Sequence, residues 1–100
     1  MKITLEIRPA ARREFDEASD WYRDEDPLLR DNFVSSVEKT LVDLSRTLLA
    51  FPVVYGSKVH RATVKRFPYS IFFTIEKELV VVLAIFHDSR NPIIWRGRVG

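Results

Sequence analysis

The sequence contains no cysteine and only three glycines, and each shortage excludes a class of site. Without cysteine there is neither a disulfide framework nor a thiolate zinc site. The glycines, Gly56, Gly97 and Gly100, leave no glycine-rich loop for a nucleotide phosphate. His60 and His87 lie on different predicted strands without carboxylates at metal-ligand spacing, so we expect neither a metal nor a cofactor.

Long apolar runs are also absent. The run Leu79–Phe86 has eight residues, whereas a membrane-spanning helix needs roughly 20. The N-terminal segment MKITLEIRP alternates and lacks the apolar block of a signal peptide. One hundred residues suffice for a single small domain with one core, residues 1–100. We therefore expect a cytoplasmic, single-domain protein that does not enter a membrane.

Charge is distributed unevenly along the chain. Residues 1–50 carry 8 Lys/Arg and 11 Asp/Glu, for a net charge of −3, and residues 51–100 carry 8 and 3, for a net charge of +5. A basic C-terminal half suggests an anionic partner, although ordinary solvated charge on a strand-rich region would look the same.

The first half predicts a strand followed by two helices. Lys2–Arg8 alternates polar and apolar residues, as in a half-buried strand. Pro9 fits the first turn of a helix. Asp26 and Pro27 fit the N-cap and first position of a second helix that runs to about Leu49. Helices joined so closely form an antiparallel hairpin.

The second half predicts three strands and a tail. Val59–Arg66 alternates, with Ala62 facing the helices and Arg61 on the open face. Tyr69–Glu76 also alternates, and Leu79–Phe86 is apolar on both faces, as in an internal strand. The predicted fold is α+β in the order β-α-α-β-β-β, with the N-terminal strand and the helical hairpin packed on a largely antiparallel twisted sheet.

Basic and aromatic side chains are interleaved in the second half. They are Lys58, Arg61, Lys65, Arg66, Tyr69, His87, Arg90, Trp95, Arg96 and Arg98. An open sheet face bearing both kinds could hold single-stranded RNA, because arginine binds phosphates and aromatic rings stack on bases. The alternative is that the aromatic residues pack in the core while the arginines pair with the acidic helices.

RNA cleavage without a metal needs a general base, a general acid and cations. His87 could serve as acid or base, and Arg61 or Arg90 as the cation, although a lone histidine is also an ordinary polar end for a strand. A second candidate site is an apolar groove between the hairpin and the sheet, which an amphipathic partner segment could fill.

Several segments, in order, resemble the ParE branch of the RelE/ParE toxin superfamily over essentially the whole chain. They are IRPAARREF leading into DWY, LLAFP at the end of the second helix, RFPYSIFF, and VVVLAIFHDSRNPIIW. The resemblance implies the toxin of a bacterial type II toxin–antitoxin pair, held inactive in a hetero-oligomer with its antitoxin. For the antitoxin groove we expect Trp21, Tyr22 and Phe33.

The superfamily divides by target, so the resemblance leaves the enzyme question open. ParE-like members inhibit DNA gyrase without a nuclease site, which is our leading hypothesis. RelE-like members cleave mRNA on the ribosome; the corresponding catalytic candidates are Arg61, Lys65, Arg66, His87 and Arg90. A non-toxic interaction module is the third hypothesis.

The tail after the last strand is expected to touch a macromolecule. We expect Ile93, Ile94 and Trp95 to dock on the domain and the arginines of the tail, Arg90, Arg96 and Arg98, to be exposed. The predicted contacts to target or antitoxin are Arg61, Tyr69, Arg90, Trp95 and Arg96.

Overall fold

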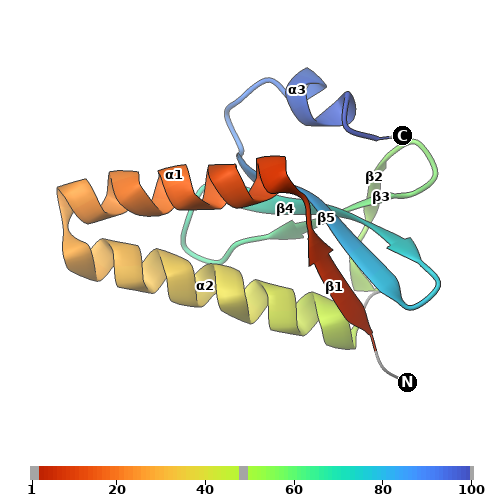
Figure 1. The fold of residues 1–100 in the computed structure, drawn as a ribbon, viewed down its shortest axis with the longest axis horizontal. Helices are drawn as coiled ribbons and strands as arrows, with labels where there is room; N and C mark the ends of the chain where they lie inside the picture. Colours follow the sequence, from red (N-terminus) through yellow and green to blue (C-terminus); the bar gives the residue numbers. More distant parts are fainter. Residues whose placement is uncertain (1–2, 48–49, 100) are drawn as a thin grey trace.

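The computed structural model describes residues 3–47 and 50–99 and confirms the predicted α+β architecture (Figure 1). Its elements are β1 (Thr4–Ile7), α1 (Pro9–Glu25), α2 (Pro27–Arg46), β2 (Val53–Tyr55), β3 (Val59–Thr63), β4 (Tyr69–Glu76), β5 (Leu79–His87) and α3 (Ile93–Arg96). The strands form one sheet in the order β1-β5-β4-β3-β2. Only the β1–β5 pairing is parallel, so the sheet is largely antiparallel as expected.

Two prolines and one aspartate define the helical hairpin. Pro9 and Pro27 each occupy the first turn of a helix, where a missing N–H costs nothing. Asp26 joins the helices: its N–H donates to Tyr22 O (2.8 Å), and its side chain accepts from Leu28 N (2.9 Å). α2 ends at Arg46, and Leu49, where we expected its end, lies outside the described residues.

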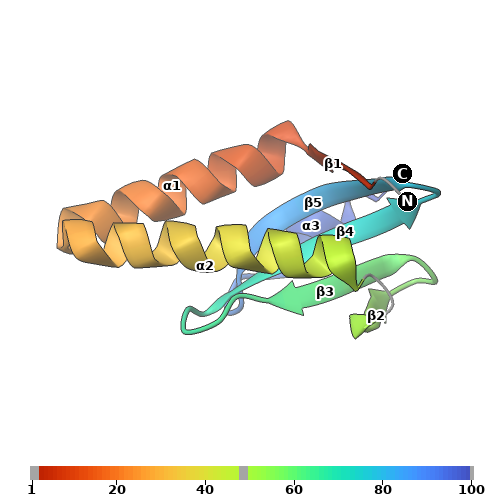
Figure 2. The ribbon, with the colours of Figure 1, turned by 90° about the horizontal axis from the view of Figure 1, so that it is seen from below.

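The hairpin packs on one side of the sheet through a core centred on Phe33 (Figure 2). The Phe33 ring is fully buried and lies 5.0 Å from Tyr22 and 5.1 Å from Tyr69, between ring centroids. Phe15 and Phe67 complete the aromatic contacts of this ring. Alternate residues of β4 belong to the same core, so the predicted alternation of that strand is confirmed.

The opposite side of the sheet has a second, smaller core beneath α3. A β-bulge places Phe72 opposite Ala84 and Phe73 opposite Val82, so that Leu83 is the extra residue in β5. As a result, Leu83 and Ala84 both lie in this second core. The sequence correctly predicts that β5 is buried on both faces, but not that it contains a bulge.

Other local predictions need correction. The strand predicted to reach Arg66 ends at Thr63, because Arg66 adopts a positive φ of 72° in the turn to β4. β2 and α3 were not predicted. The expected docking of Ile93 and Ile94 is wrong, since their side chains are 66% and 45% exposed.

Candidate functional site

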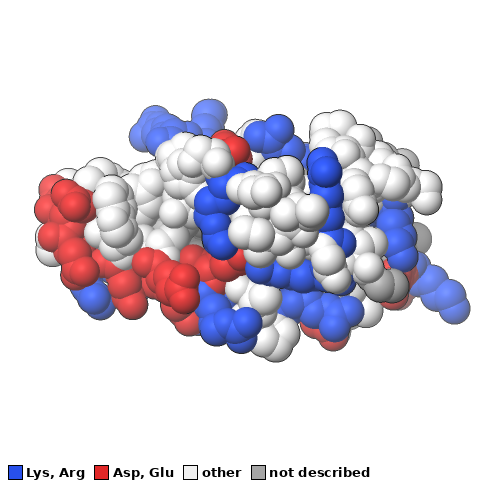
Figure 3. Space-filling model, turned by 90° about the horizontal axis from the view of Figure 1, so that it is seen from above, with Lys and Arg blue, Asp and Glu red and all other residues white. Residues whose placement is uncertain are grey.

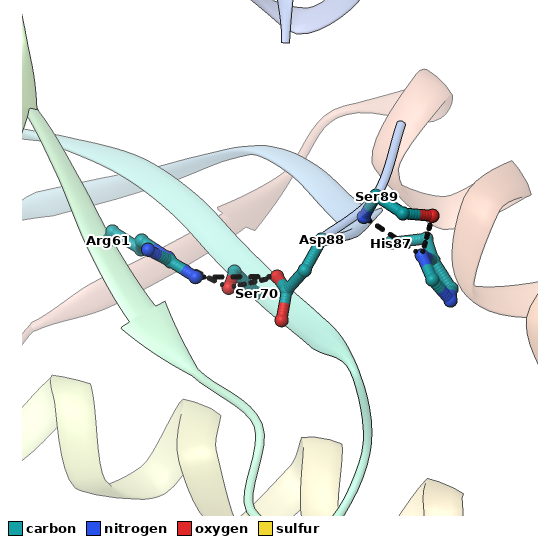
Figure 4. A network of polar contacts seen from close by, with 5 residues as sticks. All are labelled: Arg61, Ser70, His87, Asp88 and Ser89. Carbon is teal, nitrogen blue, oxygen red and sulfur yellow. Dashed lines mark hydrogen bonds and ion pairs between the residues drawn. The ribbon is translucent and has the colours of Figure 1, made fainter. Parts of the chain in front are cut away.

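The side of the sheet that faces α3 carries a polar network on three neighbouring segments (Figure 4). Arg61 Nε donates to Ser70 Oγ at 2.9 Å, and Ser70 Oγ donates to Asp88 Oδ1 at 2.7 Å. Arg61 Nη2 lies 3.5 Å from the same carboxylate oxygen. Because Ser70 is fully buried, it fixes the orientation of the Arg61 guanidinium, which remains partly open to solvent.

A cavity of about 230 Å³, here the sheet cavity, lies beside this network. Arginines reach it from three places: Arg61 from β3, Arg90 from the loop after β5, and Arg96 from α3. Asp88 is the one carboxylate among its lining residues. The structure therefore gathers at one place four of the five predicted contact residues, all except Tyr69, and the charges of this lining are positive on balance.

Trp95 also lines the sheet cavity, but its side chain is largely inaccessible. It is 2% exposed and stacks on Phe72 with ring centroids 4.2 Å apart, so the predicted docking of Trp95 on the domain is confirmed. The expectation that Trp95 is also a surface contact needs correction, because its side chain is buried. Within the described chain its Nε1 is buried without a hydrogen-bond partner. A buried donor left unsatisfied costs on the order of 1–3 kcal/mol.

His87 and Tyr69 line a depression beside α1, on the hairpin side of the sheet, although His87 is also among the residues that line the sheet cavity. Their rings meet edge-on at 5.1 Å, and Figure 4 shows the imidazole pointing away from Arg61 and Asp88. Nδ1 of His87 accepts the backbone N–H of Ser89 at 3.0 Å. Burial raises the pKa of the Tyr69 phenol, the neighbouring Tyr22 raises it further, and Arg90 opposes both. Burial likewise raises the pKa of Tyr22.

The five nuclease candidates do not come together at one site. Arg61, His87 and Arg90 border the sheet cavity, whereas Lys65 and Arg66 line a separate depression beside α2. Among residues 3–47 and 50–99, no group of three His, Cys, Asp or Glu side chains could hold a metal ion. None of the helices in this part of the chain is long and apolar enough to cross a membrane.

A larger cavity of about 610 Å³, here the interhelical groove, runs between α1 and α2. Its apolar lining comes from both helices and from the sheet: Ile7, Phe15, Val34, Val37, Leu41 and Ile85. Charged residues of both signs also line it: Arg12, Asp16, Asp20, Arg30 and Glu38. A groove with an apolar lining and charged edges has the character that receives one face of an amphipathic segment.

The residues predicted to form the antitoxin groove, Trp21, Tyr22 and Phe33, do not line the interhelical groove. Phe33 is 0% exposed and forms the centre of the core, and Tyr22 packs on it with partial exposure. Trp21 is 60% exposed near the end of α1, outside the lining of the interhelical groove. The expectation that Phe33 is available to a partner is therefore wrong, because the hairpin uses this fully buried ring for its own packing.

Glu14 holds the C-terminal tail in place, a role that sequence reasoning missed. Its carboxylate accepts two hydrogen bonds from Arg98, at 3.0 and 2.9 Å, and one from Ile85 N at 3.2 Å. Arg98 also donates to Leu83 O at 3.0 Å, and Arg90 Nη1 lies 3.6 Å from Glu14. We call these five residues the Glu14 cluster.

The Glu14 cluster supplies hydrogen-bond partners to backbone groups at the edge of β5. β1 pairs with β5 only as far as the hydrogen bond from Arg8 N to Val82 O, so Leu83 O and Ile85 N lie beyond the end of this pairing. Glu14 and Arg98 pair with these two groups in place of a strand. The predicted exposure of Arg98 is corrected, since only 23% of its side chain is accessible. A signal was present: Glu14 lies on the apolar stripe of α1, between Ala11 and Ala18.

The charge asymmetry of the sequence is visible on the surface. Acidic side chains gather at the end of the molecule where α1 meets α2, and Lys and Arg side chains are scattered over the rest of the face in this view (Figure 3). Residues 16–31, which include this end, carry seven acidic and two basic residues. Among the tail arginines, Arg90 and Arg98 pair with Glu14 of α1, and Arg90 keeps a 47% exposed side chain.

Comparison with known proteins places the chain in a family. A family model described as "ParE toxin of type II toxin-antitoxin system, parDE" matches residues 5–92. A search of curated proteins finds no match. Among solved structures, a chain of the "Chromosomal ParDE TA system from P. aeruginosa" is similar in fold, with 18% sequence identity and a TM-score of 0.75 over 85% of this chain and 95% of that one. The family model covers well over half of the sequence, and the chain therefore belongs to the ParE toxin family of type II toxin–antitoxin systems.

Proposed function

We propose that this protein arrests growth by binding DNA gyrase and that a cognate antitoxin neutralises it by binding the toxin directly. The observation that carries the proposal is the family match over residues 5–92. A non-enzymatic inhibitor acts through its surfaces, and the two cavities lie on opposite sides of the sheet. This separation leaves room for an antitoxin surface and a target surface on one small domain.

The interhelical groove is the antitoxin surface in this proposal. Its size, its apolar lining and its mixed charges suit an amphipathic helix of the antitoxin, with apolar residues at helical spacing on one face. Val34 contributes to the lining and is only partly buried in the free protein, so a partner side chain has access to it. Trp21 adds an exposed ring near the acidic end of the hairpin.

The antitoxin surface is tested with two valines of α2. Val34→Lys places a charge in the groove, whereas Val42→Lys places the same charge at a position that is 49% exposed and outside the groove lining. We expect the first substitution to weaken antitoxin binding at least tenfold in calorimetry and the second to leave it unchanged. Equal affinities for two variants with the same thermal midpoint would contradict the assignment.

Arg61, Arg90 and Arg96, with the partly buried Tyr69, are the proposed target contacts. The test is inhibition of gyrase supercoiling by the purified protein, and its relief by the antitoxin. Arg90→Ala combined with Arg96→Ala should weaken inhibition, because both side chains are exposed, whereas Arg46→Ala on α2 should not. Unchanged supercoiling at a large excess of folded toxin would reject gyrase as the target.

A ribosome-dependent mRNA endonuclease is the second candidate. It is favoured by one observation, that Arg61, His87 and Arg90 border the same cavity. The distant positions of Lys65 and Arg66 and the orientation of the imidazole count against it. Codon-positioned cuts in a translated message on addition of the toxin would establish this activity. Growth arrest on induction, relieved by the antitoxin, would exclude a non-toxic interaction module.

A further inference from the structure

We propose that the sheet cavity binds a phosphate group, independently of whether the protein inhibits gyrase. Arg61, Arg90 and Arg96 contribute three positive charges to its lining, and Asp88 contributes one negative charge. Arg90 also lies 3.6 Å from Glu14, which is outside the lining, so the excess in the cavity is between one and two positive charges. A phosphomonoester carries about −1.5 to −2 at neutral pH and presents three strong acceptor oxygens. Its negative charge and its acceptor oxygens complement the positive charge and the N–H donors of the three arginines in the cavity lining.

The three guanidinium groups are held in place with N–H groups to spare. Arg90 lies over the Phe86 ring at 4.3 Å, and Arg96 lies over the Tyr55 ring at 4.9 Å. A ring face attracts a guanidinium without using its N–H donors, so these remain for an anion. Within the described chain, Arg96 has no carboxylate within ion-pair distance. Arg61 is oriented by Ser70 and Asp88 and still has unassigned donors on its terminal nitrogens.

The same geometry disfavours a nucleobase stacked on Trp95. Trp95 is 2% exposed and stacks on Phe72, so its ring offers no free face. The volume, about 230 Å³, also falls below the range of roughly 300–1,000 Å³ typical of sites for drug-sized ligands. The cavity thus fits the phosphate group itself, whether inorganic phosphate or the phosphate of a small monoester.

Trp95 provides a direct reporter. Its indole N–H is buried and has no hydrogen-bond partner in the described part of the chain, and the residue lines the cavity. Trp21, the other tryptophan, lies on the hairpin outside this cavity and serves as an internal reference. The two indole signals in a nitrogen–proton correlation spectrum are assigned with Trp21→Phe, a change at a 60% exposed position.

The experiment titrates the full chain with inorganic phosphate, with glycerol phosphate, and with sodium chloride and sodium acetate at matched ionic strength. We expect saturable movement of the Trp95 signal with both phosphate ligands, and little movement of the Trp21 signal. Arg96→Gln and Arg61→Gln should each weaken binding at least tenfold, and Arg46→Gln on α2 should leave it unchanged. The retained dispersion of the spectrum shows that each variant is folded.

Several results would overturn the proposal. Equal movement of the Trp95 signal with chloride, acetate and phosphate would show that the signal responds to ionic strength and not to a bound phosphate. Tighter binding of a dinucleotide, which offers a singly charged diester, would show that the monoester is the wrong class. Unchanged phosphate affinity in the folded variants Arg96→Gln and Arg61→Gln would place the anion elsewhere. Gyrase inhibition is measured separately, so its failure leaves this test intact.

Discussion

Substitution of Glu14 by glutamine should destabilise the domain far more than a typical change of a helical glutamate. The carboxylate is 9% exposed and accepts two hydrogen bonds from Arg98, at 2.9 and 3.0 Å. Breaking a fully buried ion pair costs about 3–5 kcal/mol. Because Arg98 is 23% exposed and Arg90 is 47% exposed, water recovers part of this cost, and we expect a loss of about 2–3 kcal/mol in the free energy of unfolding.

For a domain of this size, 1 kcal/mol corresponds to about 4–8 °C in the thermal midpoint, so Glu14→Gln should lower that midpoint by about 8–24 °C. The assay is urea and thermal unfolding followed by circular dichroism. Glu17→Gln is the matched control, because Glu17 is exposed on the same helix, and it should change stability by less than about 0.5 kcal/mol.

A double-mutant cycle separates the ion pair from general damage to α1. Glu14→Gln and Arg98→Gln should cost less together than the sum of the two separate losses, with a coupling of about 1–2 kcal/mol. Additive losses, or a loss below about 0.5 kcal/mol for Glu14→Gln, would refute the reasoning. The tail would then be held chiefly by the packing of Trp95 in the second core.

Three further predictions concern the core, the phenols and the polar network. Phe33→Ala removes a fully buried ring and should lower the free energy of unfolding by about 3–5 kcal/mol in urea denaturation, whereas Leu28→Ala, at a 64% exposed position, should cost less than about 1 kcal/mol. The folded-state pKa values of Tyr22 and Tyr69 are raised above the unfolded value of 10.0, so the folded state holds its phenolic protons longer. Their contribution to stability is therefore complete below pH 10.0 and is lost as the pH rises above it, and the double substitution by phenylalanine should flatten this decline in unfolding measurements across that range. Ser70→Ala deletes the buried hydroxyl that links two charged groups and should cost about 1–3 kcal/mol by urea denaturation.

Local patterns sufficed for the order of the elements and for which faces are buried. Alternation in β4 and the apolar stripes of the helices follow directly from the geometry of strands and helices, so these predictions were confirmed. The bulge at Leu83 could not be predicted, because it depends on the pairing between β4 and β5. The network of Arg61, Ser70 and Asp88 could not be predicted either, because Ser70 and Asp88 are 18 residues apart in the sequence and come into contact only through the pairing of β4 with β5.

The errors about candidate binding residues have a common physical cause. Phe33 and Trp95 were chosen because large aromatic residues favour binding, yet burial of the same rings stabilises the fold, and both are at most 2% exposed. In a domain of 100 residues the core takes up many of the large apolar side chains, so the residues left for a partner to contact lie at the margin of each apolar stripe. Val34, next to Phe33 in the sequence, lines the interhelical groove. Arg96, next to Trp95, lines the sheet cavity. In both cases the aromatic residue anchors the element, and its neighbour is the better position at which to probe binding.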